Sequence, residues 1–105
     1  MTQQLTLPVQ SKIERAFWEF HAAHPEVYEE LRQLALDAKR RGRDRLGMKM
    51  LFEVVRWNRL LRTGDRGFKL NNNFTAYYAR LLMEREPELR GMFETRKLGV
   101  PSHVV

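Results

Sequence analysis

The chain has no cysteine among its 105 residues and only three histidines. Disulfide bonds, thiolate zinc sites and cysteine nucleophiles are therefore excluded, and the composition suits a reducing compartment. No apolar run approaches the roughly 18–20 residues of a membrane span. The first residues also lack the basic and apolar regions of a signal peptide. These absences predict a cytoplasmic protein with no membrane partner.

Residue sets for catalysis or cofactor binding are also scarce. His21 and His24 stand three residues apart, a spacing that can share a metal, but two imidazoles alone make a weak site. Gly64 and Gly67 match neither the phosphate loop of nucleotide hydrolases nor the dinucleotide-binding pattern. The acidic run at 84–88 is more typical of a solvated corner than of a metal site. The sequence therefore predicts a non-enzymatic protein with no metal and no cofactor.

Helical periodicity is what the chain has in abundance. Apolar residues recur at helical spacing in five stretches, separated by glycines, prolines and capping residues. These stretches cover about 11–24, 25–41, 45–62, 72–86 and 87–98. The expected fold class is therefore all-α, a single compact domain of about five helices over 11–99. An irregular arm at 1–10 and a tail at 100–105 flank it.

The third stretch carries two apolar sets that together cover more than half of its circumference. One set is Met48, Leu51, Phe52 and Val55, and the other is Met50, Val54, Trp57 and Leu61. This helix is therefore expected to be the most buried, with Trp57 in the core rather than exposed for base stacking. A turn at 63–67 and an extended segment at 68–70 follow, which leaves open a short two-stranded ribbon or wing around residues 62–70.

Basic charge is concentrated in the middle of the chain. Residues 39–69 hold eleven basic and three acidic side chains, a net charge of +8, whereas the remainder nets −2. Such a block attracts polyanions. Arginines outnumber lysines fourteen to five, and the planar guanidinium suits phosphate recognition. We therefore expect a phosphate-binding surface formed by Arg43, Arg45, Lys49, Arg56, Arg59, Arg62, Arg66 and Lys69.

Amide and aromatic side chains directly after this block are expected to line the edge of that surface. They are Asn71, Asn72, Asn73 and Tyr78, joined by Arg80. Amides bond to phosphate oxygens or adenine edges, and tyrosine rings stack on bases. One asparagine, Asn72 or Asn73, is also expected to cap the helix that follows.

The segment FKLNNNFTAYYAR at 68–80 resembles one carried by small, functionally uncharacterised proteins of bacteriophages and prophages. A following pattern of that group is matched by Pro87, Phe93, Glu94 and Arg96. The likeness spans almost the whole chain, residues 13–98. The resemblance implies a phage or mobile-element setting, and hence the cytoplasm of a host cell. It supplies no activity for any residue.

The sequence thus predicts a non-enzymatic nucleic-acid-binding protein, with DNA favoured over RNA. A helix-turn-helix with a small wing is one arrangement, although the third helix is unusually apolar for a recognition helix. Two other functions stay open. One is an interaction module or inhibitor that docks on an acidic host protein, and the other is a binder of a small anionic nucleotide.

Overall fold

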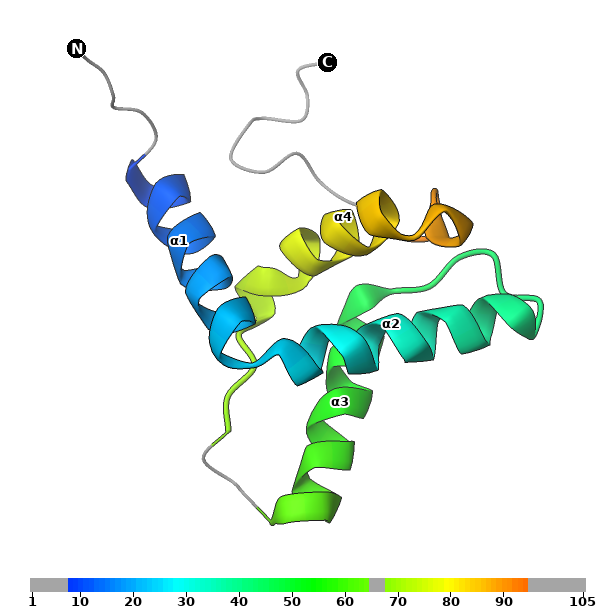
Figure 1. Cartoon of the computed structure of the whole chain (residues 1–105), viewed down its shortest axis with the longest axis horizontal. Helices are drawn as coiled ribbons and strands as arrows, with labels where there is room; N and C mark the ends of the chain where they lie inside the picture. The colour runs from blue at the N-terminus through cyan, green and yellow to red at the C-terminus, as the bar shows by residue number, and fades with distance from the viewer. Residues whose placement is uncertain (1–7, 65–67, 95–105) are drawn as a thin grey trace.

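The computed structural model describes residues 8–64 and 68–94, with side chains from Lys12 onward. Its elements are α1 (Pro8–Ala23), α2 (Pro25–Arg40), α3 (Met48–Thr63), the 3-10 turn η1 (Asn72–Phe74), α4 (Thr75–Arg85) and the 3-10 turn η2 (Pro87–Leu89) (Figure 1). No β-strand occurs among the described residues. One isolated parallel bridge joins Leu46 to Phe93. The all-α prediction is therefore confirmed, with four α-helices rather than five.

Three predicted boundaries differ from the structure. α1 begins at Pro8, so residues 8–10 are helical instead of irregular. The expected fifth helix is, within the described residues, only the single turn η2, because the chain leaves the helical conformation at Arg90, whose ψ is 128°, and Gly91 then takes a positive φ of 81°. Residues 68–70 form no strand, so the part of the expected ribbon that is described is absent, and 65–67 lie outside the described residues.

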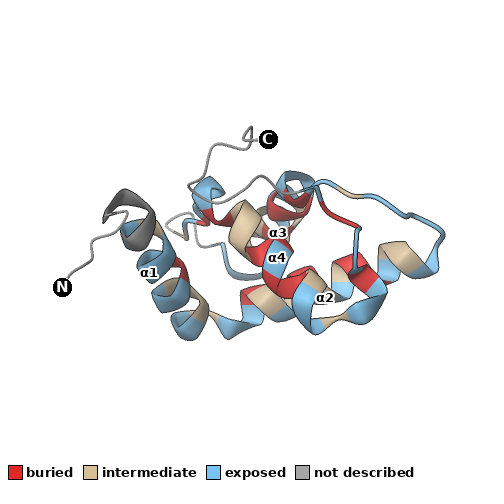
Figure 2. Ribbon diagram, turned by 90° about the horizontal axis from the view of Figure 1, so that it is seen from above, coloured by how far each residue is buried: buried red, intermediate tan, exposed pale blue. Residues whose placement is uncertain are grey.

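The core lies where α2, α3 and α4 meet. α2 packs against α3 and η2, and α4 packs against α3, η1 and η2. The buried residues lie on the sides of these helices that face one another (Figure 2). α1 joins the core at one end through Phe17, whose ring meets the ring of Tyr78 edge-on at a centroid distance of 4.8 Å.

Helix ends follow local chemistry. α2 begins with Pro25 at its first position, where the missing N–H costs no hydrogen bond. α3 ends at Gly64, which adopts a left-handed φ of 69° and donates its N–H to the carbonyl of Leu60. A side chain at position 64 would be strained in this conformation. The chain therefore leaves α3 at Gly64. Residues 68–70 lie beside α3, where Phe68 contacts Arg59 and the Leu70 carbonyl accepts a hydrogen bond from Arg56.

The two apolar faces of α3 have different environments. Met48, Leu51, Phe52 and Val55 are buried against α2 and α4. The second set is not: Met50 is 53% exposed, Trp57 60% and Leu61 64%, and Val54 is half-buried. The prediction that this helix is the most buried, with Trp57 in the core, is therefore wrong. α2 and α4 pack on one side of α3, and the side that carries Met50, Trp57 and Leu61 is largely open among the described residues.

Candidate functional site

Three cations of the predicted phosphate-binding surface are held in ion pairs. Each lies on α3 and contacts a carboxylate. The pairs are Arg56 Nη1 to Glu53 Oε2 at 2.8 Å, Arg59 Nη2 to Glu26 Oε2 at 2.8 Å, and Arg62 Nη2 to Glu30 Oε1 at 3.7 Å. A paired guanidinium must give up its partner before it binds phosphate. Arg59 and Arg62 therefore serve the contact between α2 and α3 first, whereas Arg56 is paired within α3.

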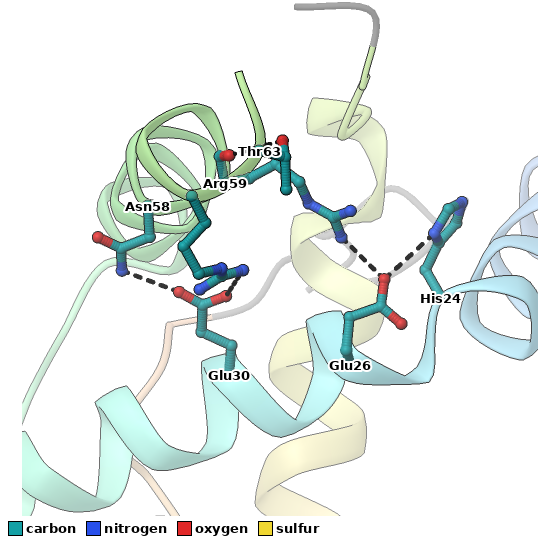
Figure 3. Close-up of polar contacts among 7 residues, drawn as sticks. His24, Glu26, Glu30, Asn58, Arg59 and Thr63 are labelled. Atoms are coloured by element: carbon teal, nitrogen blue, oxygen red, sulfur yellow. Dashed lines mark hydrogen bonds and ion pairs between the residues drawn. The ribbon is translucent and has the colours of Figure 1, made fainter. Parts of the chain in front are cut away.

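Arg59 is the most deeply held of these cations. Its side chain is only 16% exposed, and its guanidinium lies over the Phe68 ring, 3.9 Å from the ring centroid. Burial acts to raise the pKa of Glu26, but the hydrogen bonds it accepts from Arg59 and His24 and at its own backbone hold that pKa below its usual value. Figure 3 shows Arg59 reaching from α3 to Glu26 on α2. Arg59 thus fastens two helices and the segment after α3.

The Glu30 carboxylate makes a second contact between the same two helices. It accepts a hydrogen bond from Asn58 Nδ2 at 2.8 Å and lies within ion-pair distance of Arg62 (Figure 3). Glu26 and Glu30 are separated from their cationic partners, Arg59 and Arg62, by about thirty residues of sequence. The local charge pattern therefore does not predict these two pairs.

The three asparagines have separate places in the structure. Asn71 caps η1, because its Oδ1 accepts a hydrogen bond from the backbone N–H of Asn73 at 2.8 Å. The expectation that Asn72 or Asn73 is the cap is wrong. Asn72 Oδ1 accepts a hydrogen bond from Arg56 Nη2 at 2.8 Å, and the same Nη2 donates to the Leu70 carbonyl. Of the three asparagines, Asn73 alone has a side chain with no hydrogen-bond partner among the described residues.

Tyr78 cannot line a binding surface, because it is fully buried, with 0% of its surface exposed. Its ring packs against Phe17 and Phe52, and burial raises the pKa of its hydroxyl. Position 78 faces inward on α4, between the buried Phe74 and Leu82 one turn away on either side. The prediction that a base contacts Tyr78 is therefore wrong. Arg66 lies outside the described residues.

The remaining predicted cations are exposed and contact no carboxylate among the described residues. They are Arg43, Arg45, Lys49, Lys69 and Arg80. Arg45 and Lys49 line one open pocket of about 770 Å³ between the beginning of α3 and the beginning of α4. Arg43 precedes Arg45 by two residues, and Arg80 lies one helical turn beyond Ala76 in the pocket wall. We call the set Arg43, Arg45, Lys49 and Arg80, with this pocket, the cationic cleft.

The walls of the cationic cleft suit a close approach by a ligand. On α4 they consist of the small residues Thr75, Ala76 and Ala79. α3 begins at its floor with Gly47 as N-cap, without a side-chain cap and without an acidic residue in the first turn. The backbone N–H groups of that turn and the positive end of the helix dipole therefore add to the field of the two cations. Glu94 is the one acidic residue in the lining.

Sequence reasoning identified the cations of the cleft but not its walls. The sequence does contain a signal for these walls, since small residues recur at 75, 76 and 79 on one face of the fourth helix.

The described part of the chain holds no group of three or more His, Asp or Glu side chains arranged to bind a metal ion. Among these same residues, no helix has the length and apolar character needed to cross a bilayer. Neither a protein-family model nor a curated protein nor a solved structure matches the chain.

Proposed function

We propose that the protein binds nucleic acid through the cationic cleft and catalyses no reaction, with DNA as the favoured ligand. One observation carries the proposal: Arg45 and Lys49 line the same open pocket, and neither is paired with a carboxylate among the described residues. A phosphate group entering the cleft gains charge-assisted hydrogen bonds without breaking an ion pair. The whole chain, at a formal +6, adds a long-range attraction for polyanions.

The size of the cleft sets the expected salt dependence. Arg45 and Lys49 line its pocket, and Arg43 and Arg80 are close to the lining residues in sequence. The cleft thus offers fewer cations than the full basic block, because Arg56, Arg59 and Arg62 are paired with carboxylates. Binding that neutralises two to four phosphates weakens about 10- to 150-fold between 50 and 200 mM salt. The expected affinity is moderate and mostly independent of sequence, because it comes from contacts with phosphates.

The test is a fluorescence anisotropy titration with a labelled duplex, a single strand and an RNA hairpin at the two salt concentrations. The double variant Arg45→Gln/Lys49→Gln is compared with the control Lys12→Gln/Arg15→Gln. The control removes two exposed charges from α1 and gives the same net charge. We expect the cleft variant to bind at least tenfold more weakly at 50 mM salt, with a salt slope smaller by about two. The control should keep the wild-type slope.

Two outcomes contradict the proposal. The first is that no nucleic acid binds at 50 mM salt. The second is that both double variants lose affinity equally, which would mean that net charge rather than the cleft attracts the ligand.

A protein-interaction role is the second candidate function, because the outer face of α3 is apolar and exposed. Met50, Trp57 and Leu61 each show more than half of their surface to solvent. Single exposed apolar side chains are common, but a contiguous row of them marks an interaction surface. This face lies outside the cationic cleft, so the two roles do not exclude each other.

A further inference from the structure

We propose that the outer face of α3 is the interface of a homodimer, in which α3 packs antiparallel against α3 of a second copy. We call this face the apolar stripe and define it by Met50, Val54, Trp57 and Leu61. The proposal does not depend on nucleic-acid binding, because the stripe and the cationic cleft share no residue.

The spacing of the stripe is that of a helix–helix seam. Its members are separated by four, three and four residues, the alternation that places side chains along one line of a helix and into the holes of a facing helix. The row is not needed for the core, since a separate set, Met48, Leu51, Phe52 and Val55, already fills it. The chain therefore carries a second seam with no described element against it.

The stripe is complementary to itself. A two-fold axis that runs beside α3 and perpendicular to it, at the level midway between Val55 and Arg56, brings Met50 level with Leu61 of the second copy. The same axis brings Val54 level with Trp57 of the second copy. The largest side chain of the stripe thus meets the smallest, which allows the two helices to interdigitate. A parallel arrangement would instead set each residue level with its own copy, and the two Trp57 side chains would compete for the same space.

Charges beside the stripe favour the antiparallel arrangement. Glu53 lies on one flank of the stripe with 64% of its side chain exposed, next to Arg56 on the same flank. Across the two-fold axis, Glu53 falls about two residues, or 3 Å along the helix, from the level of Arg56 of the second copy. Opposite charges therefore face each other on this flank. The net charge of +6 on each chain works against association, and salt screens that repulsion.

The available area fits a weak but specific dimer. At about 200 Å² for a large side chain, the exposed fractions of Met50, Trp57 and Leu61 leave roughly 350 Å² of apolar surface on each copy. Two copies supply roughly 700 Å², more than half of the ~1,200 Å² at which specific interfaces begin, and flanking side chains add to it. We therefore expect weak association whose strength depends on how well the two helices fit together, because buried area alone does not set affinity.

Sedimentation equilibrium of the full chain over 1–500 μM tests the association. Trp57→Gln is compared with Trp18→Gln, because Trp18 is the other exposed tryptophan, 44% exposed on α1. We expect Trp57→Gln to raise the dissociation constant at least tenfold, as truncation of an aromatic anchor does. Trp18→Gln should leave it unchanged. A wild-type chain that stays monomeric at 500 μM, or two variants with equal effects, would overturn the proposal.

Disulfide trapping tests the relative direction of the two helices. Because the chain has no native cysteine, only the introduced cysteines can form a crosslink. Met50→Cys and Leu61→Cys chains are oxidised with oxidised glutathione, separately and as a mixture. The antiparallel pair predicts a crosslink between the two different chains in the mixture and little crosslinking of either chain alone. Crosslinked Met50→Cys homodimers as the main product would overturn the antiparallel arrangement.

The salt dependence separates this proposal from the proposed function. Dimerisation through the stripe should strengthen between 50 and 200 mM salt, since screening reduces the repulsion of two positively charged chains. Nucleic-acid binding should weaken over the same range. If the chain dimerises but binds no DNA, the proposed function is contradicted and the dimer is not. If the chain binds DNA but stays monomeric at 500 μM, the dimer is contradicted and the proposed function is not.

Discussion

Tyr78 is the largest fully buried side chain, and its hydroxyl has no hydrogen-bond partner among the described residues. An unpaired buried hydroxyl lowers stability, whereas the ring contacts of Tyr78 with Phe17 and Phe52 do not need it. We therefore expect Tyr78→Phe to raise the free energy of unfolding by about 1 kcal/mol. Urea denaturation measures this as a higher midpoint at an unchanged m-value.

The neighbouring Tyr77 provides the control for this substitution. It is half-buried and its ring stacks on Phe17 at 5.2 Å, but its hydroxyl is not among the buried atoms without a partner. Tyr77→Phe should change the free energy of unfolding by less than about 0.5 kcal/mol. A loss of stability in Tyr78→Phe would show instead that its hydroxyl is hydrogen-bonded in solution.

Arg59 shows, also at the residue scale, why an arginine in a basic block cannot be assigned to the binding surface from its residue type alone. An arginine in a basic block attracts phosphate in principle, yet this one contacts Glu26, 33 positions away, and the Phe68 ring. Pairs three or four residues apart, such as Glu53 with Arg56, follow from helix geometry and can be anticipated. Pairs between helices depend on packing, which the charge pattern does not encode.

At the scale of elements, the asparagine segment before α4 combines three different contributions. Asn71→Ala removes the cap of η1 and is expected to lower the free energy of unfolding by about 1 kcal/mol. Asn72→Ala removes one acceptor of Arg56 and should cost about 0.5–1 kcal/mol. Asn73→Ala should stay within about 0.5 kcal/mol of the wild type. Thermal denaturation of the three variants measures the order.

The order of stability of the three alanine variants tests whether Asn71 is the cap of η1. If Asn73→Ala is the most destabilising of the three, the cap lies at Asn73, as the sequence suggested, and the contact between Asn71 and the Asn73 backbone is not the one that holds η1. A nucleic-acid titration of Asn73→Ala at 50 mM salt then separates the two roles. An affinity change without a stability change would place Asn73 at the binding surface.

Helix positions followed from the sequence more closely than helix environments did. Pro25 and Gly42 bracket the second helix, whose predicted range of 25–41 differs from α2 by one residue. Such signals act within a few residues of the helix end. The exposure of Trp57 was not predictable in this way, because periodicity shows which residues share a face but not whether another element covers it. α2 and α4 are the helices with the main contacts to α3, and they leave one of its two apolar faces largely exposed.

At the scale of the whole molecule, three regions divide the surface. Ion pairs join α2 to α3 and to the end of α4, where Arg32 Nε contacts Glu86 Oε2 at 2.8 Å. The cationic cleft lies between the beginnings of α3 and α4, and the apolar stripe runs along the outer side of α3. In the proposed antiparallel dimer, the flank of α3 that carries Lys49 faces the same flank of the second copy. Both clefts would then open on one face, so dimerisation is expected to double the phosphate contacts available to one long ligand.

The pH dependence of folding tests how these regions are held together. Burial, with a smaller effect of the Arg85 charge, holds the pKa of His21 below its usual 6.5, and His21 Nδ1 is buried without a partner. The unfolded chain therefore takes up a proton at His21 before the folded chain does. It follows that stability is lost as the pH falls through 6.5 toward the lower pKa of the folded state. His21→Phe should flatten the unfolding free energy over this window, as measured by urea denaturation at pH 7.5, 6.5 and 5.5.

A second loss is expected at lower pH from the contact between α2 and α3. The pKa of Glu26 lies below its usual 4.5 in the folded chain, so its pairing with Arg59 contributes stability above pH 4.5 and loses it as the pH falls through the folded pKa. Glu26→Gln should therefore remove part of the decline below pH 4.5 and leave the one near pH 6.5 intact, the opposite of His21→Phe. Because the two variants act in separate windows, equal flattening of both windows by either variant would contradict the assignment of the two steps to His21 and Glu26. Separate effects would assign each step to its own residue.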